Sequence, residues 1–150
     1  RCNLPGRCDA RRLVSRRNRA QRCLRLTGFE FEEYMAQVLR DNGFRHVEVT
    51  VECGDQGVDI LAVRGGKTYA IQCKNYAGAV GNAAVQEAYA GAEYYGCDVP
   101  AVVCPTMFTA SARELAESTG VELWDGERLS HMMRVSGRRP HHDPRRDDEL

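Results

Sequence analysis

The sequence predicts an α/β fold in which helices cover both faces of a mixed central β-sheet. Two apolar segments on either side of Gly65-Gly66 indicate a β-hairpin, because a glycine pair suits its tight turn. Helical and strand-like segments then alternate from residue 82 to residue 133, which is typical of parallel strands joined by helices. A chain of 150 residues is also long enough for one domain with a core of its own.

The first half of this domain is predicted to contain one helix and three strands. Thr27, followed three residues later by a glutamate, forms a capping-box pattern that begins a helix, and Asn42-Gly43 ends it. Alternating valines in residues 47–51 predict a strand with one buried face. Residues 58–63 and 67–73 predict the two strands of the hairpin.

In the second half, helices and strands alternate. Residues 82–95 are rich in alanine and predict a helix, and the β-branched run 99–104 predicts a buried strand. A threonine cap begins a second amphipathic helix over residues 109–118. A short strand at 121–124 follows, and Asp125 caps a last helix that extends through Met133.

Charge divides the chain into three regions. Residues 1–26 contain nine arginines against a single acid and carry +8, although the whole chain is neutral. We interpret them as a basic flexible arm, which either meets a polyanion or is a solvated tail. Residues 27–135 form the predicted domain. Residues 136–150 are polar and contain two prolines, so they are expected to be a disordered tail.

The composition argues against a membrane-spanning helix and against a disulfide framework. No apolar run approaches the roughly 18 residues that a membrane span needs, and the N-terminal residues lack the apolar stretch of a signal peptide. The seven cysteines are odd in number and form no CxxC pair. The spacing of Cys2, Cys8 and Cys23 fits no paired zinc ligands. We therefore expect reduced thiols in a cytoplasmic protein.

Polar residues are expected to meet at one end of the hairpin. Asp59 interrupts an apolar strand and Lys74 ends the next one, and a buried charge is costly unless it is paired or binds a metal. The strand period of two places Gln72 and Lys74 on one face. Oxygens of Asp59, Gln72 and the Cys73 backbone carbonyl suit Mg²⁺. Lys74 could then position and help deprotonate an attacking water. A buried ion pair between Asp59 and Lys74 without a catalytic role is equally consistent with these residues.

Five short segments, spread over residues 27–133, carry a further signal. They are Thr27 to Glu32, Gly54 to Leu61, Ile71 to Lys74, Phe108-Thr109 with Ala112, and Trp124 to Gly126 with Leu129. In this order and at these distances they resemble the Mrr-type restriction endonuclease catalytic domain, a branch of the PD-(D/E)xK nuclease superfamily. The resemblance implies a restriction-endonuclease-like core and a hydrolase, a deoxyribonuclease similar to type IV restriction enzymes.

The resemblance also implies roles for individual residues. Asp59 matches the metal-binding aspartate, and Gln72 with Lys74 matches the QxK variant of the motif, in which Lys74 is the catalytic lysine. Glu32 matches an acid of the first helix that completes the metal site, although acids are common in a first helical turn. Mg²⁺ is the implied cofactor, with Mn²⁺ as a substitute. The neutral Gln72 is expected to weaken metal affinity and leaves the number of metals open.

The implied function is Mg²⁺-dependent hydrolysis of phosphodiester bonds in double-stranded DNA, methylated or unmethylated, by a homodimer in restriction or defence. Candidate DNA contacts are Asp55, Gln56, Asn75 and Tyr76, which could also be plain turn and loop residues, and Arg16, Arg17 and Arg19 of the arm. Two other functions stay open. One is a structure-specific nuclease similar to Holliday-junction resolvases, and the other is a catalytically silent DNA-binding module, against which the intact Asp59 and Lys74 argue.

Overall fold

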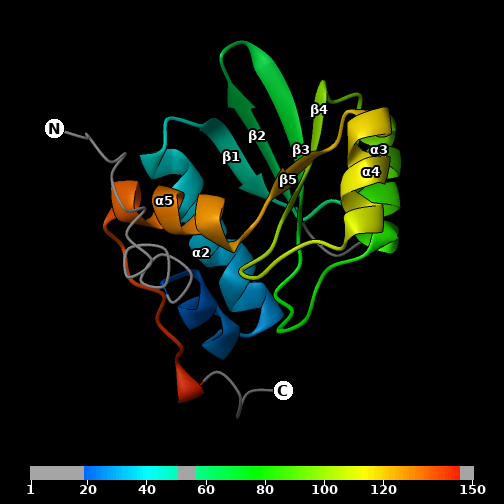
Figure 1. The fold of residues 1–150 in the computed structure, drawn as a ribbon. Helices are drawn as coiled ribbons and strands as arrows, with labels where there is room; N and C mark the ends of the chain where they lie inside the picture. The colour runs from blue at the N-terminus through cyan, green and yellow to red at the C-terminus, as the bar shows by residue number, and fades with distance from the viewer. Residues whose placement is uncertain (1–18, 51–56, 146–150) are drawn as a thin grey trace, which may run out of the picture.

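The computed structural model describes residues 19–50 and 57–145 and has a five-stranded sheet at its centre (Figure 1). The strands are β1 (Arg45–Val49), β2 (Ile60–Arg64), β3 (Lys67–Cys73), β4 (Val99–Val103) and β5 (Glu122–Trp124), and they lie in this order across the sheet. Neighbours among β1, β2 and β3 are antiparallel, whereas β3, β4 and β5 are parallel. The predicted mixed α/β sheet is thus confirmed.

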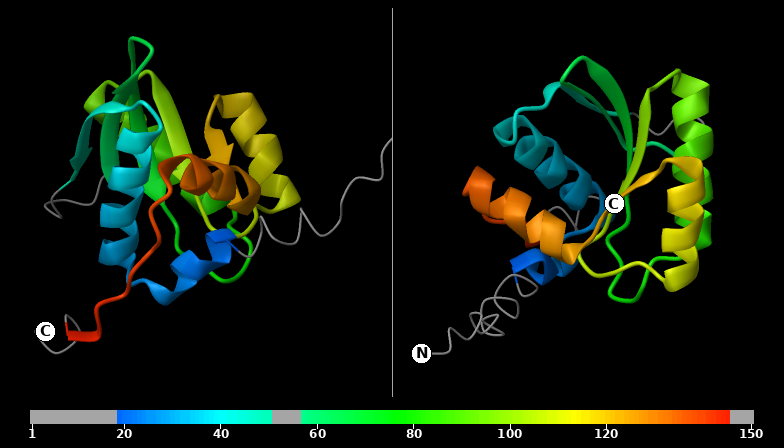
Figure 2. Two further views of the ribbon diagram at one scale, coloured as in Figure 1. Left: turned by 90° about the vertical axis from the view of Figure 1, so that its left-hand side faces the viewer. Right: turned by 45° about the horizontal axis from the view of Figure 1, so that its top comes forward.

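Helices cover both faces of this sheet, as predicted. The described helices are η1 (Arg22–Arg25, a 3-10 helix), α2 (Gly28–Asp41), α3 (Asn82–Tyr95), α4 (Ala110–Thr119) and α5 (Gly126–Ser136). The α2 and α5 helices lie on one face, and α3 and α4 lie on the other (Figures 1 and 2). Among the described helices, none is long and apolar enough to cross a membrane.

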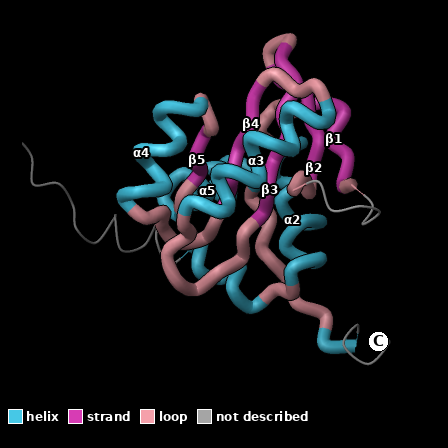
Figure 3. The backbone as a smooth tube through the Cα atoms, turned by 90° about the vertical axis from the view of Figure 1, so that its right-hand side faces the viewer, coloured by secondary structure: helices cyan, strands magenta, loops and turns pink. Residues whose placement is uncertain are grey.

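Two apolar layers hold the helices on the sheet. Beneath α2 and α5, Phe31 and Trp124 pack with Ile71 of β3. Beneath α3 and α4, which cover the face seen in Figure 3, Val85 packs with Val102 of β4. Each such buried side chain stabilises the fold by about 1.5–3 kcal/mol. Because β3 is covered on both faces, Gln72 near its end is buried.

The β2–β3 hairpin is the element that positions the candidate site. Its turn is Gly65-Gly66, with φ of +58° and +75°, a conformation that glycine adopts without a steric penalty. The register runs from Arg64 opposite Lys67 at the turn to Ile60 opposite Ile71 at the open end. If this register is continued by one residue, Asp59, which precedes β2, lies beside the end of β3.

Parts of the expected arm and of the expected tail belong to the described structure. In residues 19–26, Ala20 and Cys23 are fully buried, and the Ala20 N–H donates to the Ser130 side chain at 3.1 Å. In residues 136–145, Arg138 forms an ion pair with Asp41. The basic segment contains apolar residues that pack against the domain, and a count of its charges does not reveal this packing. Residues 1–18 and 146–150 lie outside the described residues.

Candidate active site

The candidate site lies at the open end of the β2–β3 hairpin, close to the start of α2. Asp59 directly precedes β2, and its backbone is held on both sides. Its N–H donates to the Ile71 carbonyl at 2.9 Å, and its own carbonyl accepts from the Thr50 N–H at 2.9 Å. Neighbouring strands therefore fix the position from which the Asp59 side chain extends.

The Asp59 carboxylate is bound to the strand that carries the other predicted site residues. Its Oδ2 accepts a hydrogen bond from the Cys73 N–H at 2.7 Å, a short distance typical of an ionised acceptor. Cys73 lies between Gln72 and Lys74, so this bond holds Asp59 beside both motif residues at the end of β3. The structure thus brings Asp59, Gln72 and Lys74 to one place, and their catalytic roles stay a prediction.

Glu32 reaches the same end of the sheet from the first turns of α2. Burial raises the pKa of the Cys73 thiol well above its ordinary value, and the negative charges of Asp59 and Glu32 raise it further. Both carboxylates therefore lie near this thiol. The thiol itself packs against the apolar layer under α2. It is protonated at neutral pH and has none of the features of an activated nucleophile.

Gln72, like Asn75, carries a buried oxygen that has no hydrogen-bond partner among the described residues. Gln72 is only 7% exposed, and the oxygen in question is its Oε1. Gly57 lies against it: a Cβ added to Gly57 would be 3.2 Å from this oxygen and 2.9 Å from the Glu87 carbonyl. Leaving a buried acceptor unpaired costs about 1–3 kcal/mol. This oxygen is thus placed to accept a ligand.

Lys74 is held by a residue that the sequence did not single out. Its Nζ lies 2.9 Å from Oε2 of Glu87 on α3, and 5.6 Å from the centre of the Tyr76 ring. Burial lowers the pKa of Lys74, but the hydrogen bond and charge of Glu87 outweigh it, and the pKa lies above its ordinary value. The ammonium is therefore charged at neutral pH, and the ion pair that the structure shows for it is with Glu87.

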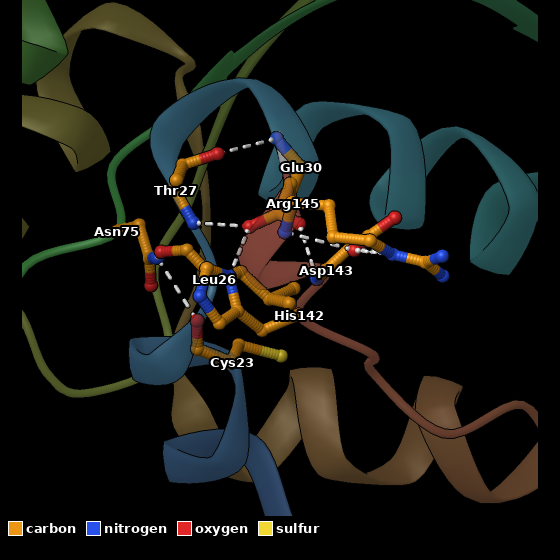
Figure 4. Close-up of polar contacts among 8 residues, drawn as sticks. All are labelled: Cys23, Leu26, Thr27, Glu30, Asn75, His142, Asp143 and Arg145. Atoms are coloured by element: carbon orange, nitrogen blue, oxygen red, sulfur yellow. Dashed lines mark hydrogen bonds and ion pairs between the residues drawn. The ribbon is translucent and has the colours of Figure 1, made fainter. Parts of the chain in front are cut away.

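The candidate DNA contacts have different surroundings. The Asn75 side-chain amide donates to the carbonyls of Cys23 and Leu26, both at 2.9 Å, and so ties the loop after β3 to η1 (Figure 4). Tyr76 is 53% exposed beside Lys74. Arg19 is half-buried at the start of the described residues. Asp55, Gln56, Arg16 and Arg17 lie outside the described residues.

The donors at this end of the sheet fit a hard divalent cation. Two carboxylates, the orphaned amide oxygen of Gln72 and a peptide carbonyl of Cys73 are all oxygen ligands of the kind that Mg²⁺ prefers. Among the described residues, no group of three His, Cys, Asp or Glu side chains is arranged to hold a metal. The proposed ligand set contains only two acids, which is consistent with that finding. Because the set carries little negative charge, it is expected to bind a metal ion weakly.

Comparisons with known proteins bear on the family and the fold of this chain. A family model for the Mrr_cat restriction endonucleases matches residues 23–133. The crystal structure of AF1548, a protein of unknown function, is similar with a TM-score of 0.64 and 22% identity, over 74% of this chain and 67% of that one. The DNA modification-dependent restriction endonuclease AspBHI gives a TM-score of 0.64 and 18% identity, over 92% of this chain and 40% of that one. A search of curated proteins gives no match.

The comparisons differ in what they establish. At these identities the two solved structures support the fold, and this chain spans less than half the length of AspBHI. The family match extends from η1 into α5, so it includes all five strands and the four site residues Glu32, Asp59, Gln72 and Lys74. The chain therefore belongs to the Mrr_cat restriction endonuclease family, a family of DNA-cleaving nucleases.

Proposed function

We propose that this chain is a Mg²⁺-dependent endonuclease that hydrolyses phosphodiester bonds of double-stranded DNA in restriction or defence, similar to type IV restriction enzymes. The observation that supports it most is the orphaned, buried oxygen of Gln72 at the end of the strand to which the Asp59 carboxylate is bonded. Native structures leave few buried acceptors unpaired, so such an atom favours a site that takes a ligand. The family match supports the nuclease part of this proposal.

The proposed mechanism assigns each side chain a task. Asp59, Gln72, Glu32 and the Cys73 carbonyl would hold Mg²⁺, for which Mn²⁺ would substitute, and the ion would supply Lewis-acid stabilisation of the phosphate. Lys74 would orient the attacking water and offset the negative charge that builds up on the phosphate. Because its pKa is raised, Lys74 is protonated at neutral pH, which favours this electrostatic role over that of a proton acceptor.

The substrate and setting are also proposals. AspBHI is a modification-dependent restriction endonuclease, which makes methylated duplex DNA a candidate substrate here. Cutting both strands calls for two active sites, so a homodimer is expected. The described cysteines, Cys23, Cys73, Cys97 and Cys104, are free thiols, which suits a reducing compartment such as the cytoplasm.

Plasmid cleavage tests this proposal. Supercoiled plasmid, methylated and unmethylated, is incubated with Mg²⁺ and with wild type, Asp59→Ala or Lys74→Ala. Wild type should nick and linearise the plasmid, and each variant should be slower by at least about 100-fold. Lys67→Ala, an exposed lysine at the other end of the same strand, is the matched control and should cleave at the wild-type rate.

Two outcomes would contradict the proposal. If wild type and both variants nick every plasmid at the same background rate, the chain is not a nuclease, and the DNA-binding module without catalysis is favoured. Strong preference for a four-way junction over plasmid would replace restriction by structure-specific cleavage, the resolvase-like alternative. EDTA should abolish the wild-type activity in either enzymatic case.

A further inference from the structure

Arginines from two distant parts of the chain gather in one groove beside the candidate site. We call this surface the arginine groove. It is lined by Arg19, Arg22 and Arg25 around η1 and by Arg134, Arg138 and Arg139 at and after the end of α5. Two adjoining hollows make up the groove, the larger of about 530 Å³, and they share Arg22 and Arg139. Arg19 is also one of the candidate DNA contacts, and none of the six arginines belongs to the proposed metal and catalytic residues.

The C-terminal side of the groove is fixed by specific bonds to α2. His142 Nδ1 lies 2.8 Å from Oε1 of Glu30, and the Asp143 N–H donates to Oε2 of the same carboxylate at 3.0 Å (Figure 4). Glu30 is only 8% exposed and the His142 side chain is 33% exposed, so the carboxylate of this anchor is buried and the imidazole is half-buried. Further along, the Tyr34 hydroxyl donates to the Arg138 carbonyl at 2.9 Å. The groove is therefore part of the fold.

The groove has far more positive than negative charge. Residues 19–25 and 134–145 together contain seven arginines and one acid, Asp143, which pairs with Arg145. Arg138 pairs with Asp41. Among the described residues, Arg22, Arg25 and Arg139 form no ion pair. Such crowding of guanidinium groups is unfavourable by itself, and a polyanion relieves it. Guanidinium groups match phosphate oxygens in shape and charge.

The groove adjoins the end of the sheet that carries the candidate site. Asn75, which follows Lys74 directly, donates to the carbonyls of Cys23 and Leu26. These two hydrogen bonds attach η1, with Arg22 and Arg25, to the loop that leaves β3 (Figure 4). A polyanion bound in the groove therefore lies next to the candidate site.

We propose that the arginine groove binds the phosphate backbone of duplex DNA beside the bond that the site cleaves. The position of that bond rests on the proposed function, whereas the binding itself does not. Phosphate contacts carry no sequence information, but they set register and supply much of the affinity. The groove thus supplies a basic surface that the acidic remainder of the domain lacks.

DNA binding in EDTA tests the groove without cleavage. Wild type and a triple variant, Arg22→Gln with Arg25→Gln and Arg139→Gln, are titrated against a fluorescent duplex at several salt concentrations. The triple variant should bind at least about tenfold more weakly, and the slope of log K against log salt should fall by about 3. All three side chains are exposed, so thermal unfolding by circular dichroism should show a folded variant.

Two matched variants separate the groove from net charge. Arg64→Gln, Lys67→Gln and Arg113→Gln together remove the same charge from the hairpin turn and from α4, and should leave affinity and slope near those of wild type. A variant in which Arg22, Arg25 and Arg139 are all changed to lysine keeps the positive charge. It should therefore retain most of the slope of log K against log salt.

The inference is wrong if the groove variant and the control variant bind DNA with equal affinity and equal slope. It is also wrong if the groove arginines matter for duplex RNA and not for duplex DNA. A wild type that binds DNA through the groove but does not cleave with Mg²⁺ would reject the proposed function and support the groove.

Discussion

Lys74, which directly follows β3, and Glu87 of α3 form an ion pair, with 2.9 Å between Nζ and Oε2. The side chain of Lys74 is 15% exposed and that of Glu87 is 45% exposed, so water screens the pair. Such a pair contributes at most about 1 kcal/mol to stability. Its importance is that it fixes the direction of the ammonium at the end of β3, where the proposed reaction needs a charge.

We therefore expect Glu87→Gln to change catalysis more than stability. Burial, which lowers the pKa of Lys74, would remain, whereas the charge that raises it would be lost. The alkaline limb of the pH–rate profile should move to lower pH, and cleavage should slow by about 3- to 100-fold because the ammonium is less well oriented. Glu93→Gln, an exposed glutamate on the same helix, is the control. A profile that superimposes on that of wild type would show that Glu87 does not position Lys74.

The orphaned oxygen of Gln72 makes a second prediction. Gln72→Glu places an ionisable group in a 7% exposed position, so without metal it should destabilise the fold by roughly 2–3 kcal/mol. Added Mg²⁺ should restore the melting temperature, because a ligand that binds only the folded state stabilises it. Thermal unfolding in EDTA and across a Mg²⁺ series measures this. Gln86→Glu, exposed on α3, should be indifferent to Mg²⁺. If Mg²⁺ left the melting temperature of Gln72→Glu unchanged, Gln72 would not be a metal ligand.

Local patterns account for what the sequence predicted well. The capping box of Thr27 and Glu30, the glycine pair of the hairpin and the threonine cap at Thr109 each fix their own element through contacts a few residues apart. Elements and sheet type follow from such signals because helices and strands have different periods. The meeting of Asp59 and Cys73 also follows, since a tight turn sets the register.

Tertiary contacts account for what was missed. Glu87 resembles any other acid on its helix, and only the packing of α3 across β3 brings it to Lys74. His142 and Glu30 are 112 residues apart, and the polar composition of the C-terminal segment concealed their contact. Composition describes a segment on average. It does not show that a single buried carboxylate, that of Glu30, can hold the C-terminal segment in place. The sequence predicted that the basic segment could meet a polyanion, with Arg19 as a candidate DNA contact, but it did not predict that Arg138 and Arg139 would line the same groove.

Gly57 gives a prediction about the packing around Gln72. Its φ is +71°, and an added Cβ would be 2.9 Å from the Glu87 carbonyl, so Gly57→Ala should combine backbone strain with a clash. Gly66→Ala is the matched control, since its φ is +75° and a Cβ there would meet nothing within 4 Å. We expect a loss of about 1 kcal/mol for Gly66→Ala and about 2–4 kcal/mol for Gly57→Ala in urea unfolding. Equal losses would show that the close approach at Gly57 relaxes freely.

Acid should weaken the anchor of the arginine groove. The Thr27 N–H, then His142 and the Asp143 N–H, lower the pKa of Glu30 from 4.5 to about 2. A carboxyl with a lower pKa in the folded state stabilises the fold above its unfolded pKa, and this contribution is lost as pH falls through the folded pKa. The free energy of unfolding should therefore fall between about pH 4.5 and pH 2.

Glu30→Gln tests this dependence directly. The variant should be less stable than wild type at pH 7 and should lose less stability on acidification, because glutamine does not titrate. Asp41 and Asp98 also have lowered pKa values and remain in the variant, so part of the slope should persist. Urea unfolding from pH 7 to pH 2 gives both curves, and Glu117→Gln, exposed on α4, is the control. Parallel curves for wild type and Glu30→Gln would mean that protonation of Glu30 does not weaken the fold, and that the C-terminal side of the groove is held by its other contacts with α2.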